Sequence, residues 1–388
     1  MARIVNVHII TRLELGGAQQ NTLYTVTHLD PARFMTYLVS GRGGLMDAEA
    51  ISLLGNRLIF LDSLVREISP WTDLRALLGL VRILRRIRKE NRGLPVVVHT
   101  HSSKAGLLGR IAARLAGIRG IVHTYHGFGF HDFQKKWVRS VFILLERVAS
   151  RVTQRQVFVS RDNERVGRAL GLVRMESRVI RSGISFQAFR EAAAGREKIR
   201  RELGISATLP VVTTIACFKP QKAPLDFVAM ADAVRKDYPS VLFLMAGDGE
   251  LRPEAEEEIS RRGLQKHLRL LGWRRDIPEL LSGSDLFVLS SLWEGLPRVL
   301  IEASLSGLPI VTTDIEGASE IVREGETGFI VPRKDYLALA RKVLYLLQNP
   351  AEAAKMGESA RAVPPEFDID EMVRAQERLY ESLYERPF

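Results

Sequence analysis

Short apolar runs alternate with longer segments of helical periodicity along almost the whole chain. In the first half the runs predict strands at residues 4–10, 35–40, 57–61, 96–100, 121–124 and 156–160, with one more near Val179. In the second half they predict strands at 211–217, 241–246, 268–271, 286–289, 310–312 and 329–331. Apolar strands separated by helices are typical of parallel sheets covered by helices on both faces. The pattern therefore predicts a doubly wound α/β architecture.

The patterning is weakest at residues 184–210, a charged segment between the strand near Val179 and the next strand. A chain of 388 residues exceeds what one core usually organises. We expect two domains, residues 1–200 and 201–388, and the last helical pattern, 366–388, ends the second of them. Ligands of open α/β sheets bind beyond the carboxyl ends of the strands, so the loops that follow strands are the candidate sites.

Composition narrows the class of protein only a little. With 46% hydrophobic and 26% charged residues, the chain resembles ordinary soluble proteins. Its single cysteine, Cys217, permits neither an intramolecular disulfide nor a cysteine-rich metal site, which fits a reducing cytoplasm. The first apolar run is interrupted by Arg12 and predicts a strand, not a signal peptide. No segment approaches the roughly 20 apolar residues of a membrane span.

The net charge of +11 indicates an anionic partner, such as nucleic acid, lipid headgroups or a phosphorylated substrate. Basic residues concentrate at 81–92 and 131–155. In the second segment they are interleaved with apolar residues at helical spacing: Trp137, Val141, Leu144, Leu145 and Val148. This pattern fits a half-buried helix with a solvated basic side, and it also fits a helix resting on an anionic bilayer. Zinc-finger spacing and aromatic RNA-binding signatures are absent from the sequence, which disfavours nucleic acid.

Two loops of the first half contain residues suited to a ligand. Gly16 and Gly17 follow the first strand, and a helix is expected near Gln19. Such a turn either closes tightly or brings backbone N–H groups to a phosphate; it is not the G-x-G-x-x-G of dinucleotide enzymes. After the fifth strand, His123, His126 and His131 crowd two glycines. Their spacing does not suit a metal, so a histidine that bonds a polar ligand or a simple loop histidine is expected.

In the second half, Lys219 and Lys222 follow the strand that begins at Val211, where two ammonium groups can neutralise a diphosphate or simply face solvent. Glycine turns follow two further strands, at 245–253 and 271–280.

Glu294 follows another strand, before a helix that starts near Pro297, and Glu302 lies inside that helix. The backbone N–H groups of the first helical turn suit an anion. Carboxylates beside it are favourable when sugar hydroxyls donate hydrogen bonds to them. The pair therefore suits a nucleotide sugar, or else a capping acid and a solvated helix acid.

Together these segments resemble the family 4 glycosyltransferases, over nearly the whole chain. The shared motifs are GGAQ at 16–19, HTHSSKAGLLGRIAARLAG at 99–117, HTYHGF at 123–128, KPQK at 219–222, AGDGE at 246–250 and EGLPRVLIEA at 294–303. In the last of these, Glu294 and Glu302 form the E-x7-E pattern. The resemblance implies the GT-B fold, in which two Rossmann-like domains face each other across a cleft and the last helix returns to the N-terminal domain.

The resemblance also implies roles for individual residues. His126 matches the histidine at the reaction centre, Lys222 should bind the donor phosphates, Glu294 the transferred sugar and Glu302 the ribose. His126, Glu294 and Lys222 are thus the expected catalytic residues. The expected donor-binding set is Gly16, Gly17, Lys219, Lys222, Gly272, Trp273, Arg274, Glu294, Gly295, Leu296, Pro297, Arg298, Val299 and Glu302.

One departure concerns the phosphate site. Relatives commonly have an arginine where this chain has Cys217. Because Lys219 is close in sequence and positively charged, we hypothesise that it replaces that arginine.

The expected reaction is retaining transfer of a sugar, with the leaving diphosphate accepting the proton of the acceptor and no metal or other cofactor required. The triplet Asp368-Ile369-Asp370 is interpreted as helix capping, not as a metal site. Most relatives use UDP, so a UDP-hexose or UDP-N-acetylhexosamine donor is expected. The acceptor is expected to be a glycan, or a glycan linked to polyprenyl diphosphate, in cell-surface polysaccharide synthesis. The enzyme would then be cytoplasmic and peripheral at the membrane, held there by its basic N-terminal domain. A nucleotide-sugar epimerase and a non-catalytic nucleotide-sugar-binding protein are the alternatives.

Overall fold

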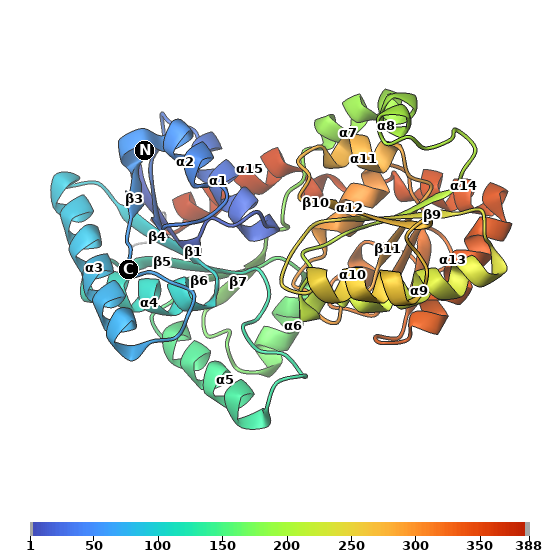
Figure 1. Cartoon of the computed structure of the whole chain (residues 1–388). Helices are drawn as coiled ribbons and strands as arrows, with labels where there is room; N and C mark the ends of the chain where they lie inside the picture. The colour runs from blue at the N-terminus through green and yellow to red at the C-terminus, as the bar shows by residue number, and fades with distance from the viewer. Residues whose placement is uncertain (1–2, 385–388) are drawn as a thin grey trace. The chain divides into compact units, whose positions relative to one another are not determined.

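The computed structural model describes residues 3–384, which form two compact units (Figure 1). Unit 1 contains the residues up to Gly183 together with those from Ile369 onward, and unit 2 contains Ile184–Asp368. Each unit is an α/β domain built on one parallel sheet. The prediction of two doubly wound domains is therefore confirmed.

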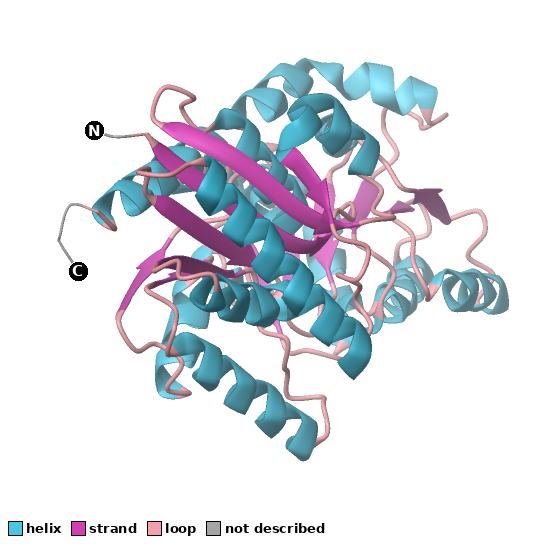
Figure 2. Cartoon of the chain, turned by 90° about the vertical axis from the view of Figure 1, so that its left-hand side faces the viewer, coloured by secondary structure: helices cyan, strands magenta, loops and turns pink. Residues whose placement is uncertain are grey.

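The sheet of unit 1 has seven strands in the order β3-β2-β1-β4-β5-β6-β7. Their bounds are β1 Ile4–Arg12, β2 Phe34–Gly41, β3 Leu58–Phe60, β4 Val96–His101, β5 Gly120–Tyr125, β6 Arg155–Phe158 and β7 Glu176–Val179. The helices of unit 1 lie on both faces of this sheet (Figure 2). They are α1 Gly17–His28, α2 Asp47–Leu54, α3 Pro70–Glu90, α4 Ser103–Leu115, α5 Lys136–Ser150, α6 Arg161–Ala169 and α15 Ile369–Ser382, with a 3₁₀ turn at Gly55–Arg57.

The sheet of unit 2 has six strands in the order β10-β9-β8-β11-β12-β13. Their bounds are β8 Val211–Ile215, β9 Leu242–Ala246, β10 Leu268–Gly272, β11 Leu286–Leu289, β12 Ile310–Thr313 and β13 Gly328–Val331. The helices are α7 Phe186–Ala192, α8 Arg196–Glu202, α9 Pro224–Asp237, α10 Arg252–Arg261, α11 Ile277–Ser282, α12 Arg298–Leu305, α13 Tyr336–Gln348 and α14 Pro350–Ala360. Shorter 3₁₀ turns occur at Ala193–Gly195, Pro220–Lys222, Ala318–Glu320 and Pro365–Phe367.

Every predicted strand is present, but β8 is shorter than predicted. This strand ends at Ile215, not at Cys217, because the chain turns to meet the loop after β9. The N–H of Phe218 donates to the carbonyl of Asp248 at 2.9 Å.

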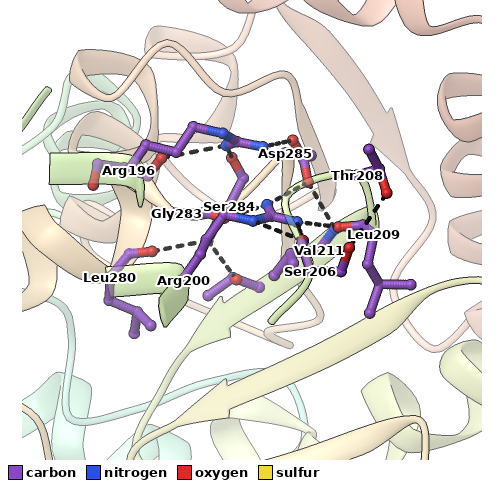
Figure 3. A network of polar contacts seen from close by, with 12 residues as sticks. Arg196, Arg200, Ser206, Thr208, Leu209, Val211, Leu280, Gly283, Ser284 and Asp285 are labelled. Carbon is purple, nitrogen blue, oxygen red and sulfur yellow. Dashed lines mark hydrogen bonds and ion pairs between the residues drawn. The ribbon is translucent and has the colours of Figure 1, made fainter. Parts of the chain in front are cut away.

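The division into units differs from the predicted boundary near residue 200. Arg196 and Arg200, on α8, both reach Asp285, just before β11, and Arg200 also donates to the Gly283 carbonyl at 2.9 Å (Figure 3). Asp285 in turn accepts from the N–H of Val211 at 2.8 Å. These contacts fix residues 184–200 to the sheet of unit 2, although their sequence is too polar to indicate a sheet-covering segment.

The last helix returns to unit 1, as expected. In Figure 1 α15, in red, lies beside α1, in blue. Its residues Met372, Leu379 and Tyr380 share one core cluster with Val97 and Val122 of the central strands. The helix ends at Ser382, and the residues from 385 to 388 of the predicted helix lie outside the described part of the chain.

Candidate functional site

The catalytic candidates of unit 2 lie where the strand order of its sheet reverses, between β8 and β11. Lys222 ends the 3₁₀ turn after β8, and Glu294 lies in the loop after β11. At such a switch point the two connections leave in opposite directions, which opens a crevice for a ligand at the carboxyl ends of the strands. The topology thus brings together two residues that are far apart in sequence.

Glu294 is the centre of a polar cluster. Its carboxylate forms an ion pair with Lys222, and its side chain is only 8% exposed. Ser291 Oγ donates to the carboxylate at 2.8 Å, and Gln221 Nε2 donates to it at 3.4 Å. The N–H of Glu294 donates to Glu316 Oε2 at 3.4 Å. The sequence did not single out Gln221, Ser291 and Glu316, although each lies in a loop that follows a strand.

The second acid, Glu302, is on α12, one turn from its first residue. Burial raises the pKa of Glu302, and Arg298 partly opposes this shift. Burial also lowers the pKa of Arg298, which Glu302 opposes. Glu302 is only partly exposed and lies beside Arg298, which does not fit the alternative of a fully solvated helix acid.

The start of α12 offers fewer backbone donors than its sequence indicated. Gly295, Leu296 and Pro297 are buried, and Pro297 caps the helix. The N–H of Arg298 donates to the carbonyl of Leu296 at 2.9 Å. It is thus already engaged, which corrects the expectation that this N–H group of the first helical turn is available to an anion. The structure shows no such bond for Val299.

The glycines of the AGDGE loop allow this loop to pack closely against the loop after β8. Gly247 and Gly249 have φ of +131° and +155°. A Cβ on Gly247 would lie 1.9 Å from the carbonyl oxygen of Ala216, and one on Gly249 would lie 2.6 Å from that of Phe218. Only glycine allows the loop after β9 to approach the loop after β8 this closely.

The predicted donor-binding residues Gly272, Trp273 and Arg274 lie at the end of β10 and in the loop after it, beside these two loops. The carbonyl of Gly272 accepts from the N–H of Gly247 at 2.8 Å, and Trp273 is 44% exposed. Arg274 is held by Asp276, with Nε donating to Oδ1 at 2.8 Å. The loops after β8, β9 and β10 are therefore tied together.

Lys219 interacts with Cys217, the position at which the resemblance implies an arginine. Burial raises the pKa of the Cys217 thiol, while Lys219 and Lys222 oppose the shift. Two cations thus lie close to this position.

In unit 1 the strand order reverses between β1 and β4. Gly16 caps α1, which starts at Gly17 rather than near Gln19. The φ of Gly16 is −150°, and a Cβ there would meet only the flexible side chain of Gln19. The fold itself does not require glycine at this position. Ser102, which follows β4, has a φ of +62°, and its Oγ lies 2.8 Å from Thr11 Oγ1. Strain of this kind is common at functional sites.

His126, just after β5, belongs to a chain of histidines that the sequence did not predict. Its Nε2 lies 3.0 Å from Nδ1 of His101, whose Nε2 lies 3.0 Å from Nδ1 of His8. The other two histidines have different partners: the side chain of His123, within β5, bonds Thr100 Oγ1 at 2.9 Å, and the backbone N–H of His131 donates to Gln134 Oε1 at 3.3 Å. The signal that was missed is the histidine within the apolar strand β1 together with the two histidines at alternate positions of β4.

Helix α5 carries its apolar stripe outward. Trp137 is 68% exposed and Leu144 is 60% exposed, whereas Glu146 is buried and bonded to Arg110 at 2.7 Å. The remaining exposed apolar residues of this stripe are Val141, Leu145 and Val148. The stripe is therefore not half-buried. Within residues 3–384, no helix is long and apolar enough to cross a membrane.

The fold and these sites define a two-domain α/β enzyme whose loops are suited to a nucleotide sugar. A family model described as Glycosyltransferase Family 4 matches residues 15–187, and one described as Glycosyl transferases group 1 matches residues 195–363. A galactosyltransferase from Escherichia coli is 34% identical over 86% of this chain and 85% of its own length. The chain belongs to the family 4 glycosyltransferases and is a hexosyltransferase.

The names and folds of other relatives agree. The Escherichia coli enzyme is a UDP-Gal:alpha-D-GlcNAc-diphosphoundecaprenol alpha-1,3-galactosyltransferase. An N,N'-diacetylbacillosaminyl-diphospho-undecaprenol alpha-1,3-N-acetylgalactosaminyltransferase of Campylobacter jejuni is 27% identical over 86% of each chain. Among solved structures, HepE of Anabaena in complex with UDP and glucose superposes with a TM-score of 0.78 at 20% identity, over 97% of this chain and 99% of HepE. That structural likeness confirms the GT-B fold.

Proposed function

We propose that the protein transfers a hexose or N-acetylhexosamine, with retention of configuration, from a UDP-sugar to a glycan carried on polyprenyl diphosphate. The observation that carries the proposal is the Lys222–Glu294 pair at the switch point of unit 2. Two relatives whose names specify the acceptor act on undecaprenyl-diphosphate-linked sugars. The same chemistry suits a chain with a net charge of +11, because both substrates carry diphosphates.

The pair suggests how the donor is held. Without a donor, Lys222 and Glu294 neutralise each other. A diphosphate can take over the ammonium group, and Glu294 is then released to accept hydrogen bonds from sugar hydroxyls. Catalysis would consist of positioning and of stabilising the charge that develops on the leaving diphosphate, whose oxygen accepts the proton of the acceptor.

We propose that no metal takes part. Lys219 and Lys222 supply positive charge where a metal-dependent enzyme would use a cation. The carboxylate of Asp370 accepts a hydrogen bond from the Tyr24 hydroxyl at 2.6 Å, while the backbone of Asp368 forms a β-bridge with Ile184 in unit 2. The two aspartates thus have separate structural partners. Transfer should therefore persist in the presence of a chelator.

The donor test measures thermal stabilisation of the whole chain by a panel of UDP- and GDP-sugars. One UDP-sugar should raise the unfolding temperature, because a ligand that binds only the native state stabilises it by mass action. That sugar is then offered with lipid-linked acceptors, and labelled sugar should appear in the lipid fraction. Turnover of the donor without acceptor would instead indicate the epimerase, and binding without transfer would indicate a silent binding protein.

We further propose that α5 rests on the anionic surface of the membrane that holds the acceptor. Its outward apolar stripe includes Trp137 and Leu144, and the exposed Lys135 and Lys136 lie at its start. An apolar face flanked by cations matches a bilayer with acidic headgroups better than it matches a neutral protein surface.

Changing Trp137 and Leu144 together to serine is expected to weaken binding to vesicles of acidic phospholipid by more than about tenfold. Burial of a large apolar side chain contributes about 1.5–3 kcal/mol. Co-sedimentation measures the effect, and high salt should release the wild-type protein. Leu337→Ser, on α13, removes a leucine that is 48% exposed outside this stripe and should change nothing. Equal binding of the double variant and wild type would refute the assignment of α5.

A further inference from the structure

A continuous hydrogen-bonded chain runs from His126 through the core of unit 1 to α15. It passes through His101 and His8 by the two 3.0 Å contacts described above. His8 Nε2 then lies 3.5 Å from the Tyr380 hydroxyl, which donates to Gln376 Oε1 at 2.8 Å. The last helix of the chain thus connects to a predicted catalytic residue that precedes it by more than 240 positions.

His8, His99 and His101 are neutral at physiological pH. Burial lowers the pKa of His8 to about 3. It also holds the pKa values of His99 and His101 well below the usual range, and the neighbouring histidines add to that effect. A neutral imidazole has one donor nitrogen and one acceptor nitrogen. Therefore the direction of any one bond sets the direction of the whole chain.

The far end of the chain sets that direction. Gln376 Nε2 donates to Thr25 Oγ1 at 3.2 Å, which leaves its amide oxygen to accept from Tyr380. Because the Tyr380 proton is committed to Gln376, the hydroxyl oxygen accepts from His8 Nε2–H. It also accepts from His99 Nδ1–H, and this Nδ1 lies 2.6 Å from the hydroxyl oxygen. His99 Nε2 then accepts from Thr124 Oγ1 at 2.7 Å.

The same reasoning fixes the direction of the hydrogen bonds from His8 to His126. With its proton on Nε2, His8 presents the lone pair of Nδ1 to His101 Nε2–H. His101 in turn accepts at Nδ1, which requires the proton of a neutral His126 to be on Nε2. His126 is held as one tautomer, and its orientation is fixed from inside the protein.

A metal is the other interpretation of this cluster. The ligand atoms of His8, His99 and His101 lie within 4.8 Å of one another. However, both nitrogens of each ring already lie within hydrogen-bonding distance of a partner: His101 contacts His8 and His126, His99 contacts Tyr380 and Thr124, and His8 contacts His101 and Tyr380. A metal would break several of these bonds. The hydrogen-bonded chain satisfies all three rings without one.

A small cavity lies against the chain. Its lining includes His101, His126, Thr25, Gln376 and Arg181, all from unit 1. The cavity has room for about one water molecule. The chain of histidines therefore adjoins a small cavity that polar and apolar side chains line together.

We infer that His101, His8 and Tyr380 are positioning residues that hold His126 in the Nε2–H tautomer for sugar transfer, with α15 as their anchor. This inference rests on the proposed role of His126 at the reaction centre. In serine proteases a buried carboxylate holds the catalytic histidine in the correct tautomer, and its replacement lowers kcat strongly. We therefore expect that fixing the tautomer of His126 affects turnover more than binding.

The test compares Tyr380→Phe with Tyr384→Phe in the full-length enzyme. Each removes one hydroxyl of the same C-terminal segment, and that of Tyr384 donates to the carbonyl of Val96 at 2.9 Å, outside the chain of histidines. Nitrogen NMR of ¹⁵N-histidine-labelled protein reports the tautomer of His126 directly. The wild type and Tyr384→Phe should show Nε2–H alone, whereas Tyr380→Phe should show a mixture of tautomers.

Kinetics supply the second readout. Tyr380→Phe should lower kcat about tenfold with little change in KM for the donor, as expected when a proton-handling group loses its orientation. Tyr384→Phe should retain wild-type kcat. Unchanged tautomer and kcat in a folded Tyr380→Phe variant would overturn the inference, and so would stoichiometric zinc on the purified wild type. Failure of the wild type to transfer any sugar would instead refute the proposed function, while the NMR result still decides the tautomer.

Discussion

Replacing Lys222 by methionine is expected to lower kcat/KM for sugar transfer by about 10²–10³-fold. The ammonium group is the cation that pairs with Glu294 at the switch point of unit 2. Removing it takes away a charge that would stabilise the leaving diphosphate, and loss of one such preorganised group typically costs this much. It also leaves a Glu294 carboxylate that is only 8% exposed without its cation. Initial rates with the donor identified by thermal stabilisation measure the effect.

The same assay tests whether Lys219 replaces the missing arginine. Lys219→Ala should weaken donor binding, but less than Lys222→Ala does, because Lys219 pairs with no carboxylate among the described ion pairs. If Lys219→Ala leaves donor affinity unchanged while Lys222→Ala weakens it strongly, the substitution hypothesis fails.

A double-mutant cycle with Glu294→Gln separates the two roles of Lys222. If the pair acts as a unit, the double variant should lose much less activity than the sum of the two single losses. Additive losses would show that the two side chains act on separate parts of the donor. A Lys222→Met enzyme with wild-type kcat/KM would contradict the assignment of the site altogether.

The sequence predicted the sheets well where the strands are fully buried. Runs such as those of β9 and β11 are apolar at every position, and all their residues are buried. The end of β8 was less predictable, since Ala216, Cys217 and Phe218 also read as apolar. Their turn is set by the glycines of the loop after β9, which lie far away in the sequence.

The candidate site was predictable only where the chemical type of a residue, such as its charge, indicated a role without knowledge of its neighbours in the fold. Glu294 and Lys222 are charges after apolar strands, and this contrast is visible in the sequence. Their mutual ion pair was not, because pairing between loops depends on the strand order. The partners Gln221, Ser291 and Glu316 are ordinary loop residues until the fold places them around the carboxylate.

Two features of unit 1 could not be predicted for opposite reasons. The stripe of α5 has the pattern of a buried face, and only the structure shows that the helix turns this stripe outward. The histidines of β1 and β4 are polar residues within buried, apolar strands. Hydrophobic periodicity predicts these strands but assigns no role to single polar residues inside them. Their meaning depends on β1 lying beside β4, which places His8 opposite His99.

Unit 1 is expected to lose stability steeply as the pH falls below 6.5. Four of its histidines have pKa values lowered by burial: His8, His99, His101 and His123. The unfolded chain binds protons at these side chains from about pH 6.5, whereas the folded chain does so only at much lower pH, about 3 for His8. Since the unfolded state then holds more protons, its free energy falls relative to the folded state as the pH decreases.

The expected size of this effect is large. Each such histidine lowers the free energy of unfolding of unit 1 by about 1.4 kcal/mol per pH unit below 6.5, so four together lower it by about 5 kcal/mol per pH unit. A whole domain is typically stable by only about 5–15 kcal/mol. Unit 1 should therefore unfold near pH 5. Unit 2 contains one histidine, His267, so it should remain folded under the same conditions.

Calorimetric scans between pH 7.5 and 4.5 should show two unfolding transitions. The midpoint temperature of the first, from unit 1, should fall as the pH falls, whereas that of the second, from unit 2, should change much less. His123→Asn should reduce the pH slope of the first transition by about one quarter, because one of four proton sites is gone. The control is His28→Gln, which removes an exposed histidine from α1 and should leave the slope unchanged. A first transition that stays level from pH 7 to pH 5 would mean that the core histidines are already protonated in the folded protein. The direction of every bond from Tyr380 to His126 would then have to be reassigned, because a protonated imidazole donates from both nitrogens.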